Sequence, residues 1–361
     1  MFALRLFLLL LLAPPLVRGA ATDSPRDVSA TLEMVRAKHG LPGCAVAVAE
    51  KGKLTATGAA GVLRVGKTAL VDTDDLWPIA SCTKSMTATL VGMVVDTGKL
   101  RWDMPVPEAL PGFACNRAWR KVTVWDVVTH RSGLGPLWYP ENSQIISVLS
   151  PEQQREAYVR SIVAREPAGP PGKSAYSNAG YAMLGVMVER ALGEPYESAL
   201  KKRIFAPLAL DSAGFGPVSG GLSELSGHQR DGDRIVPKNA PTGATSSVMT
   251  PAAGVQVSIT DFARYAAWVS SNEPKLLAAE TAAKLGTPPQ DDKYAGGVWK
   301  TVMPGIGGEA LCHTGTIGGF FCVMYTSGGR ACVAAINLEG FGWEWIGDEI
   351  VAEVLKLDAG K

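Results

Sequence analysis

The amino-acid sequence predicts an α/β (α+β) fold, in which one antiparallel sheet is flanked by helices and joined to an all-helical lobe. Strand patterns occur near both ends of the chain, within residues 44–60 and 296–337, so the sheet is expected to draw on both ends. Between them, from Arg101 to about Met249, helical patterns alternate with loops that contain proline. Since no long Gly, Ser or Pro linker bounds this middle part, we expect an insertion within one domain.

The first 21 residues are typical of a cleaved signal peptide. Arg5 supplies a short basic region, residues 6–13 are apolar, and Gly19 and Ala21 are the small residues of a cleavage site. The alternative is an uncleaved N-terminal anchor. The signal peptide predicts an exported protein, either periplasmic or secreted.

A single domain is then expected over residues 22–361, with a sheet lobe of about 22–98 and 250–361 and a helical lobe of about 99–249. Of the 361 residues, 47% are hydrophobic, which is ample for a sizeable core. The net charge is +1, and the basic residues are scattered among acidic ones. This balance predicts no nucleic-acid partner, and no segment after the signal peptide resembles a membrane span.

The sheet lobe is expected to begin with a helix and two strands. The dipeptide Ser24-Pro25 is typical of an N-cap followed by the first helical residue, and Gly40 is a natural stop. Residues 44–49 alternate small and branched side chains, which predicts a strand with one alanine face on which a helix can pack closely. A partner strand is expected over residues 54–60.

Apolar residues at helical spacing predict the remaining helices. These helices are expected at residues 122–130, 151–164, 178–192, 196–204, 258–270 and 276–285. Gly193 is the expected C-cap of the third of them. Strand patterns return at residues 296–303, 309–314, 319–326 and 331–337. A final helix is expected to bury Ile346, Ile350, Val351 and Val354.

Six cysteines occur, and none of them forms a C-x-x-C pair. Export makes disulfides possible. If the segments around Cys312 and Cys322 form a hairpin centred near Ile317, the two thiols lie opposite each other and a bridge can form. The alternative is unpaired thiols.

Ser81 and Lys84 form an S-x-x-K pair where an apolar extended segment turns into a helix. On a helix the three-residue spacing brings the amine beside the hydroxyl. A partly desolvated lysine can lose its charge and activate the serine as a nucleophile. A second match, Ser198 to Lys201, lies within a continuous helical pattern with no free helix end beneath it.

Tyr176 and Asn178 flank Ser177 just before a predicted helix. In an extended stretch, residues two apart point the same way, so both side chains can face one cleft. A tyrosine can transfer a proton, and an asparagine can hold a substrate amide. The alternative makes Asn178 the N-cap of the helix and Tyr176 a packing residue.

His313, Thr314 and Gly315 lie at the end of an edge-type strand, before a glycine-rich turn. Gly315 lets a substrate backbone approach closely, and Thr314 offers a hydroxyl to a carboxylate or carbonyl. A lone histidine such as His313 is more often structural than catalytic.

The order S-x-x-K, Y-S-N and H-T-G, each in its expected structural context, resembles the serine penicillin-recognising superfamily. Its members include class C β-lactamases, D-alanyl-D-alanine carboxypeptidases and related esterases and D-amino-acid peptidases. The resemblance covers nearly all of the chain after the signal peptide and includes residues 123–134 and 251–258. It implies a β-lactamase/transpeptidase-like fold.

The resemblance also implies a role for each motif residue. Ser81 is the acylated nucleophile, Lys84 its activating base, and Tyr176 assists proton transfer. Which of Lys84 and Tyr176 acts as the base at each step stays open. Asn178 orients the substrate, and Ser81 and Thr316 supply the N–H groups of an oxyanion hole. The substrate carboxylate is expected to contact His313 and Thr314.

The chain departs from the β-lactamase pattern at His313, where those enzymes usually carry a lysine. Lysine is fully charged at neutral pH and histidine mostly is not, so efficient penicillin hydrolysis is not the first choice. The sequence predicts an exported serine hydrolase that acts through an acyl-enzyme, most similar to D-alanyl-D-alanine carboxypeptidases and D-amino-acid peptidases. Its substrate would be a small molecule or peptide, such as a peptidoglycan stem peptide, an ester or a β-lactam.

Alternatives are a carboxylesterase or weak β-lactamase of the same fold, or a non-catalytic peptidoglycan-binding or penicillin-binding protein. An α/β-hydrolase would need a G-x-S-x-G motif, which is absent. A metallohydrolase would need clustered ligands, but the four histidines are far apart in the sequence. We therefore expect neither a metal nor a cofactor.

Overall fold

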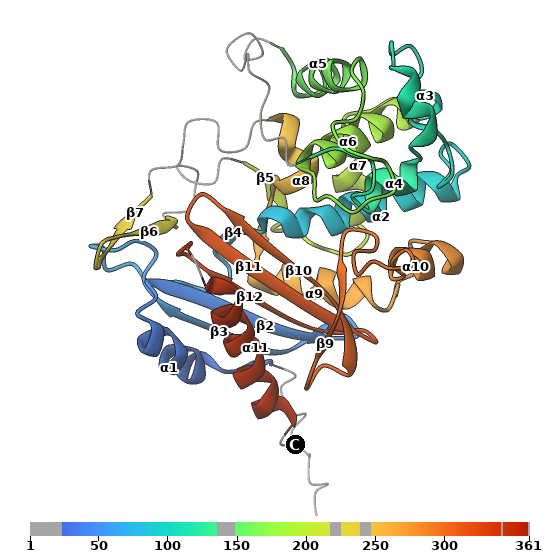
Figure 1. The fold of residues 1–361 in the computed structure, drawn as a ribbon. Coiled ribbons are helices and arrows are strands. Elements are labelled where there is room, and N and C mark those ends of the chain that lie inside the picture. The colour runs from blue at the N-terminus through green and yellow to red at the C-terminus, as the bar shows by residue number, and fades with distance from the viewer. Residues whose placement is uncertain (1–23, 136–148, 217–224, 239–246, 341, 360–361) are drawn as a thin grey trace, which may run out of the picture.

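The computed structural model describes residues 24–135, 149–216, 225–238, 247–340 and 342–359 (Figure 1). The expected signal peptide, residues 1–21, lies outside these ranges, and its prediction stays untested. None of the helices in the described ranges combines the length and apolar character needed to cross a bilayer.

A seven-stranded sheet forms the centre of one lobe, with the order β1-β3-β2-β12-β11-β10-β9. All neighbours are antiparallel except β1 and β3. The strands are β1 (Arg26–Asp27), β2 (Gly43–Glu50), β3 (Lys53–Gly61), β9 (Trp299–Met303), β10 (Gly308–Ile317), β11 (Phe320–Ser327) and β12 (Arg330–Ile336). Both ends of the chain contribute, as the strand patterns predict.

Helices cover both faces of this sheet (Figure 1). On the outer face α1 (Ser29–His39) packs on β3 and β2, and α11 (Trp343–Ala359) packs on β12 and β11. On the inner face α9 (Ile259–Val269) packs on β2 and β12, where β2 presents only Ala45, Ala47 and Ala49. The small side chains let the helix approach closely, as the alternation in β2 predicts.

The first helix begins later than the dipeptide Ser24-Pro25 predicts, so that prediction is wrong. Residues Arg26 and Asp27 are extended and pair in parallel with Ala56 and Thr57 of β3. The helix starts at Ser29, whose backbone N–H donates to the carboxylate of Asp27 at 2.9 Å. Pairing with the sheet edge outweighs the local capping signal, whereas Gly40 ends the helix as expected with φ 62°.

The second lobe is mostly helical. Its helices are α2 (Thr83–Asp96), α3 (Val106–Ala109), α4 (Val124–Val128), α5 (Pro151–Val163), α6 (Asn178–Leu192), α7 (Tyr196–Leu200), α8 (Thr250–Ala253) and α10 (Ala279–Leu285). In space α2 packs on α6, α8 and α10, so the helix that follows Ser81 groups with this lobe and not with the sheet lobe, to which residues 22–98 were assigned from the sequence. The α6 bounds and its Gly193 cap match the sequence prediction.

Short strands also occur within residues 99–249, so this part is not wholly helical. One small sheet has the order β4-β8-β5, formed by β4 (Leu76–Pro78), β8 (Val255–Ser258) and β5 (Gly214–Phe215). A separate hairpin pairs β6 (His228–Asp231) with β7 (Arg234–Pro237). The first of these sheets fixes the segment that delivers the chain to Ser81.

The bridge between Cys312 and Cys322 that the sequence left possible does not form, and the alternative of unpaired thiols is what the structure shows. The hairpin turns at Gly318 and Gly319, both with positive φ, and not at Ile317. The centre of the hairpin is thus shifted by more than one residue from the predicted one. As a result Cys322 pairs with Gly315, and both cysteines are free thiols. The two-glycine turn, typical of type I′ hairpins, sets the register instead.

Candidate active site

Ser81 lies at the junction between β4 and α2. The strand β4 pairs with β8, and the backbone N–H of Ile79 donates to the carbonyl of Val255 at 3.1 Å. Ala80 then adopts a left-handed φ of 46°, which is uncommon for a residue with a side chain. The chain turns there through one 3₁₀ turn, Ala80–Cys82, into α2. Ser81 is therefore presented at the start of a helix, as predicted.

Lys84 lies one turn further along, with its side chain fully buried. Its amine contacts three acceptors: Ser81 Oγ at 3.1 Å, Asn178 Oδ1 at 2.7 Å and the carbonyl oxygen of Ala252 at 2.9 Å. All three are uncharged. Burial therefore lowers the pKa of Lys84 to about 7, and a large neutral fraction can accept a proton from Ser81 at neutral pH.

Tyr176 lies next to both Ser81 and Lys84. Its hydroxyl is close to Ser81, and its ring packs on the His130 ring with centroids 4.3 Å apart. The Lys84 amine lies 4.8 Å from the centre of the same ring. Burial raises the pKa of Tyr176 far above neutral, so the phenol keeps its proton. Of the two residues that the sequence leaves open as base, the geometry favours Lys84.

Asn178 reaches Lys84 because it does not cap its own helix. The N-cap of α6 is Ser177, whose Oγ accepts from the N–H of Gly180 at 3.3 Å. The amide of Asn178 is 5% exposed and accepts from Lys84. Capping by Asn178, the alternative that the sequence left open, is therefore not what the structure shows.

The strand β10 forms the wall facing Ser81. It lies between the edge strand β9 and β11, but its pairing with β9 ends at Cys312, so residues from His313 onward pair with β11 alone. In a hairpin closed by Ile317 and Phe320, backbone groups alternate toward and away from the partner. The N–H and C=O of Thr314 and Thr316 consequently point to the open side, where an extended substrate could pair.

Gly315 brings this open edge against the serine. A Cβ built on it would lie 2.3 Å from the Ile79 carbonyl oxygen and 2.9 Å from the Ser81 nitrogen. The strand and the nucleophile turn are thus in backbone contact at this glycine. The oxyanion hole predicted from the N–H groups of Ser81 and Thr316 would lie at this contact.

His313 is buried, with 2% of its surface exposed. Its Nδ1 donates to the carbonyl of Thr314 at 2.5 Å, and its Nε2 accepts from the hydroxyl of Tyr294 at 3.3 Å. Burial lowers the pKa of His313 to about 3, so the ring is neutral and both nitrogens are engaged. The geometry does not favour the predicted contact with a substrate carboxylate.

Thr314 and Thr316 also differ from their predicted use. Strand alternation directs their side chains to the face opposite His313, and Thr316 is exposed. Both residues therefore present mainly backbone N–H and C=O groups to the open edge. The hydroxyl contact predicted for Thr314 stays a prediction.

Sequence reasoning missed three groups of the site. His130, in a left-handed conformation with φ 58°, accepts from the N–H of Ser177 at 3.1 Å and supports Tyr176. Tyr294 holds His313, and Ala252 supplies a carbonyl to Lys84. His130 lies in a motif noted from the sequence, but no local pattern marks Tyr294 or Ala252. No group of side chains suited to a metal ion occurs among the described residues.

Comparisons with known proteins relate this chain to β-lactamases and penicillin-binding proteins. A profile described as Beta-lactamase matches residues 28–353. Penicillin-binding protein 4 of Amycolatopsis lactamdurans is 35% identical over 184 residues, 49% of this chain and 46% of the relative. A Beta-lactamase of Pseudomonas fluorescens is 27% identical over 191 residues, 53% of this chain and 50% of the relative. The chain thus spans about half the length of these curated relatives.

The crystal structure of a D-amino acid amidase from Ochrobactrum anthropi SV3 superposes with a TM-score of 0.73 at 20% identity. The superposition covers 92% of this chain and 99% of that one. At this identity the likeness establishes a common fold.

Proposed function

The chain belongs to the Beta-lactamase family, a family of serine hydrolases, and we propose that it cleaves amide or ester bonds through an acyl-enzyme on Ser81. The observation that carries the proposal is the buried Lys84 amine, 3.1 Å from Ser81 Oγ and surrounded by uncharged acceptors. A lysine in a purely structural role would need a carboxylate partner to remain charged when buried.

In the proposed reaction Lys84 accepts the proton of Ser81 as Oγ attacks the carbonyl carbon of the substrate. The negative charge that develops on the carbonyl oxygen is stabilised by the N–H groups of Ser81 and Thr316. Tyr176 donates its proton to the leaving group and regains one from the Lys84 ammonium. Water then attacks the acyl carbon and gives up a proton to Lys84. A proton passes through the same two groups to Ser81 Oγ as the bond between Oγ and the acyl carbon breaks, which releases the acid product.

The first candidate for the substrate is a D-amino-acid peptide of the D-alanyl-D-alanine type. The open edge of β10 fits an extended peptide, because Thr314 and Thr316 present backbone groups there. The name of the Amycolatopsis relative, a penicillin-binding protein, is consistent with this class. A carboxypeptidase must also accept a free C-terminal carboxylate beside this edge.

The second candidate is an amide or ester without a carboxylate, and the neutral, buried His313 favours it. A matched pair of substrates separates the two: N-acyl-D-Ala-D-Ala and its C-terminal amide, compared by kcat/KM. A preference for the free acid of tenfold or more would support the carboxypeptidase. Equal rates, or a preference for the amide, would support the second candidate.

A covalent serine probe tests the proposal as a whole. We expect a fluorophosphonate to label the wild-type protein and the Ser198→Ala control, but not Ser81→Ala. Ser198 is matched because it belongs to the other S-x-x-K pair, within α7. If no serine-directed probe, including a fluorescent penicillin, labelled the folded wild type, the chain would be a non-catalytic member of its family.

A further inference from the structure

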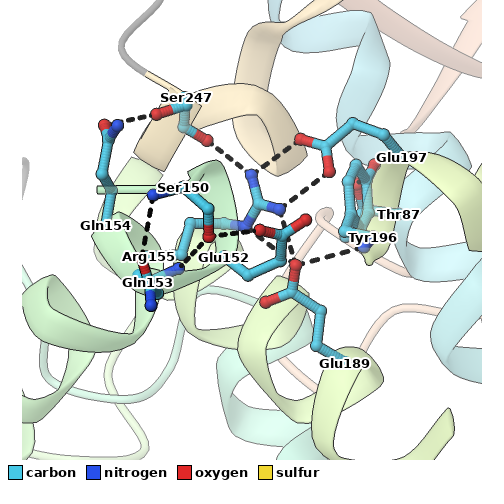
Figure 2. Close-up of polar contacts among 10 residues, drawn as sticks. All are labelled: Thr87, Ser150, Glu152, Gln153, Gln154, Arg155, Glu189, Tyr196, Glu197 and Ser247. Carbon is cyan, nitrogen blue, oxygen red and sulfur yellow. Dashed lines mark hydrogen bonds and ion pairs between the residues drawn. The ribbon is translucent and has the colours of Figure 1, made fainter. Parts of the chain in front are cut away.

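A fully buried arginine in the helical lobe binds two carboxylates and a backbone carbonyl (Figure 2). Arg155 of α5 has no exposed surface. Its guanidinium binds Glu189 of α6 at 2.6 Å, Glu197 of α7 at 2.7 Å and the carbonyl oxygen of Ser247 at 2.6 Å. One side chain therefore ties three helices to the segment that precedes α8.

Stability alone does not explain such a cluster. Burying charges costs several kcal/mol for each ion, and buried ion pairs replaced by apolar side chains are often as stable or more so. The guanidinium also sets geometry, because its N–H donors lie in one rigid plane and so determine where the surrounding acceptors sit. The adjacent Gln154 accepts a hydrogen bond from Ser247 Oγ at 2.5 Å, so two consecutive residues of α5 hold Ser247.

The held segment leads directly to the catalytic amine. Ser247–Met249 form one 3₁₀ turn that continues into α8, and the α8 residue Ala252 accepts from Lys84 Nζ at 2.9 Å. The helix α8 has only four residues, so its neighbours must position it. Pro251 of α8 accepts from Thr87 of α2 at 2.6 Å.

The same arginine also binds the helix that carries Asn178, another acceptor of Lys84. Glu189 lies on α6, and Asn178, the first residue of α6, accepts from the Lys84 amine at 2.7 Å. At Gly185 of α6 an added Cβ would lie 2.5 Å from the Pro251 side chain, so α6 and α8 touch closely. Both elements that supply Lys84 with neutral acceptors are thus fixed by Arg155.

We propose that Arg155 is a positioning residue for Lys84, which it serves by fixing α6 and α8 so that Asn178 and Ala252 meet the amine. The kinetic part of this inference rests on the proposed function, whereas the structural part does not. The titratable groups that face the amine, Cys82, His130, Tyr176, Tyr181 and His313, are all kept uncharged by burial. The orientation of the neutral acceptors therefore determines how well the protonated Lys84 amine is stabilised.

The test removes the charges of the cluster together, because Arg155→Met alone would leave two carboxylates without their cation and could unfold the protein. The triple variant Arg155→Met/Glu189→Gln/Glu197→Gln releases Ser247 but keeps an acceptor for the N–H of Tyr196, which binds Glu189. Arg160→Met is the matched control, since Arg160 lies on the same helix but is 42% exposed and binds Glu156. Circular dichroism and thermal unfolding establish that each variant is folded.

The first readout is the titration of the Lys84 amine, followed by ¹⁵N NMR and assigned by its loss in Lys84→Met. In the triple variant we expect a lower midpoint, because an ammonium that loses an acceptor is less stable. The Arg160→Met midpoint should equal the wild-type one. A midpoint in the folded triple variant that is unchanged or raised would overturn the inference, and this readout needs no activity.

The second readout is the rate of fluorophosphonate labelling of Ser81. We expect it to fall about tenfold in the triple variant, because misplacing a catalytic group by a fraction of an ångström costs about that much. If the wild type is labelled and the folded triple variant is labelled equally fast, the inference fails while the proposed function stands. If the wild type is not labelled at all, the proposed function fails and the NMR titration alone decides.

Discussion

Replacing Lys84 by methionine is expected to lower the acylation rate of Ser81 by about 10³-fold, the range for a lost general base. Methionine keeps the apolar stem of the lysine, so the core around α2 stays filled, but no group remains within reach to accept the serine proton. The buried Tyr176 cannot substitute, because burial raises the pKa of its phenol far above neutral. Burst kinetics with a p-nitrophenyl ester would measure the acylation step.

The dependence of kcat/KM on pH provides a second test of Lys84 as the base. The Lys84 amine must be neutral to act as a base, and its pKa is lowered to about 7. In the wild type kcat/KM should therefore rise as the pH increases through about 7 and fall as the amine becomes protonated below it. His313, with a pKa lowered to about 3, stays neutral over this range and adds no step of its own.

Lys201→Met is the matched control, since Lys201 belongs to the second S-x-x-K pair and is exposed. It should retain the wild-type rate and profile. The residual activity of Lys84→Met should lack the rise near pH 7. A folded Lys84→Met variant that acylates at the wild-type rate would show that Lys84 is not the base.

The sequence predicted those features whose signals are local. The alternation of residues 44–49 indicated which face of β2 meets α9, and Gly193 correctly marked the end of the helix that becomes α6, although its N-cap is Ser177 and not Asn178. Ser81 was separated from Ser198 by local context alone. Such signals suffice because periodicity and capping act within one element.

The groups that the sequence missed act over long separations. Ala252 contacts Lys84 through a backbone carbonyl, which any residue type could supply. Tyr294 carries no motif and reaches His313 because it bridges to Trp299 of β9, which pairs with β10. The role expected for His313 assumed an accessible ring, but burial is set by tertiary packing, which a three-residue motif does not report.

Substituting alanine for Gly315 is expected to impair both folding and catalysis. The added Cβ would lie 2.3 Å from the Ile79 carbonyl oxygen, 2.9 Å from the Ser81 nitrogen and 3.0 Å from the Cβ of Ala80. The nearest of these atoms belong to the backbone, so no side chain can rotate away, and β10 must separate from the turn at Ser81. Overpacking of this kind costs about 1–3 kcal/mol of stability.

The catalytic effect of Gly315→Ala should be larger than its effect on stability. Separating β10 from the turn moves the N–H of Thr316 away from that of Ser81, so the two can no longer stabilise one oxygen. The loss of an oxyanion-hole donor costs about 10²- to 10³-fold in kcat, and we expect that loss in the folded variant, measured on a p-nitrophenyl ester. Gly214→Ala is the matched control, because a Cβ there meets nothing within 4 Å on the strand β5. If Gly315→Ala kept the wild-type kcat while Gly214→Ala did the same, the backbone contact at Gly315 would not set the oxyanion hole, and β10 would serve only to bind the substrate.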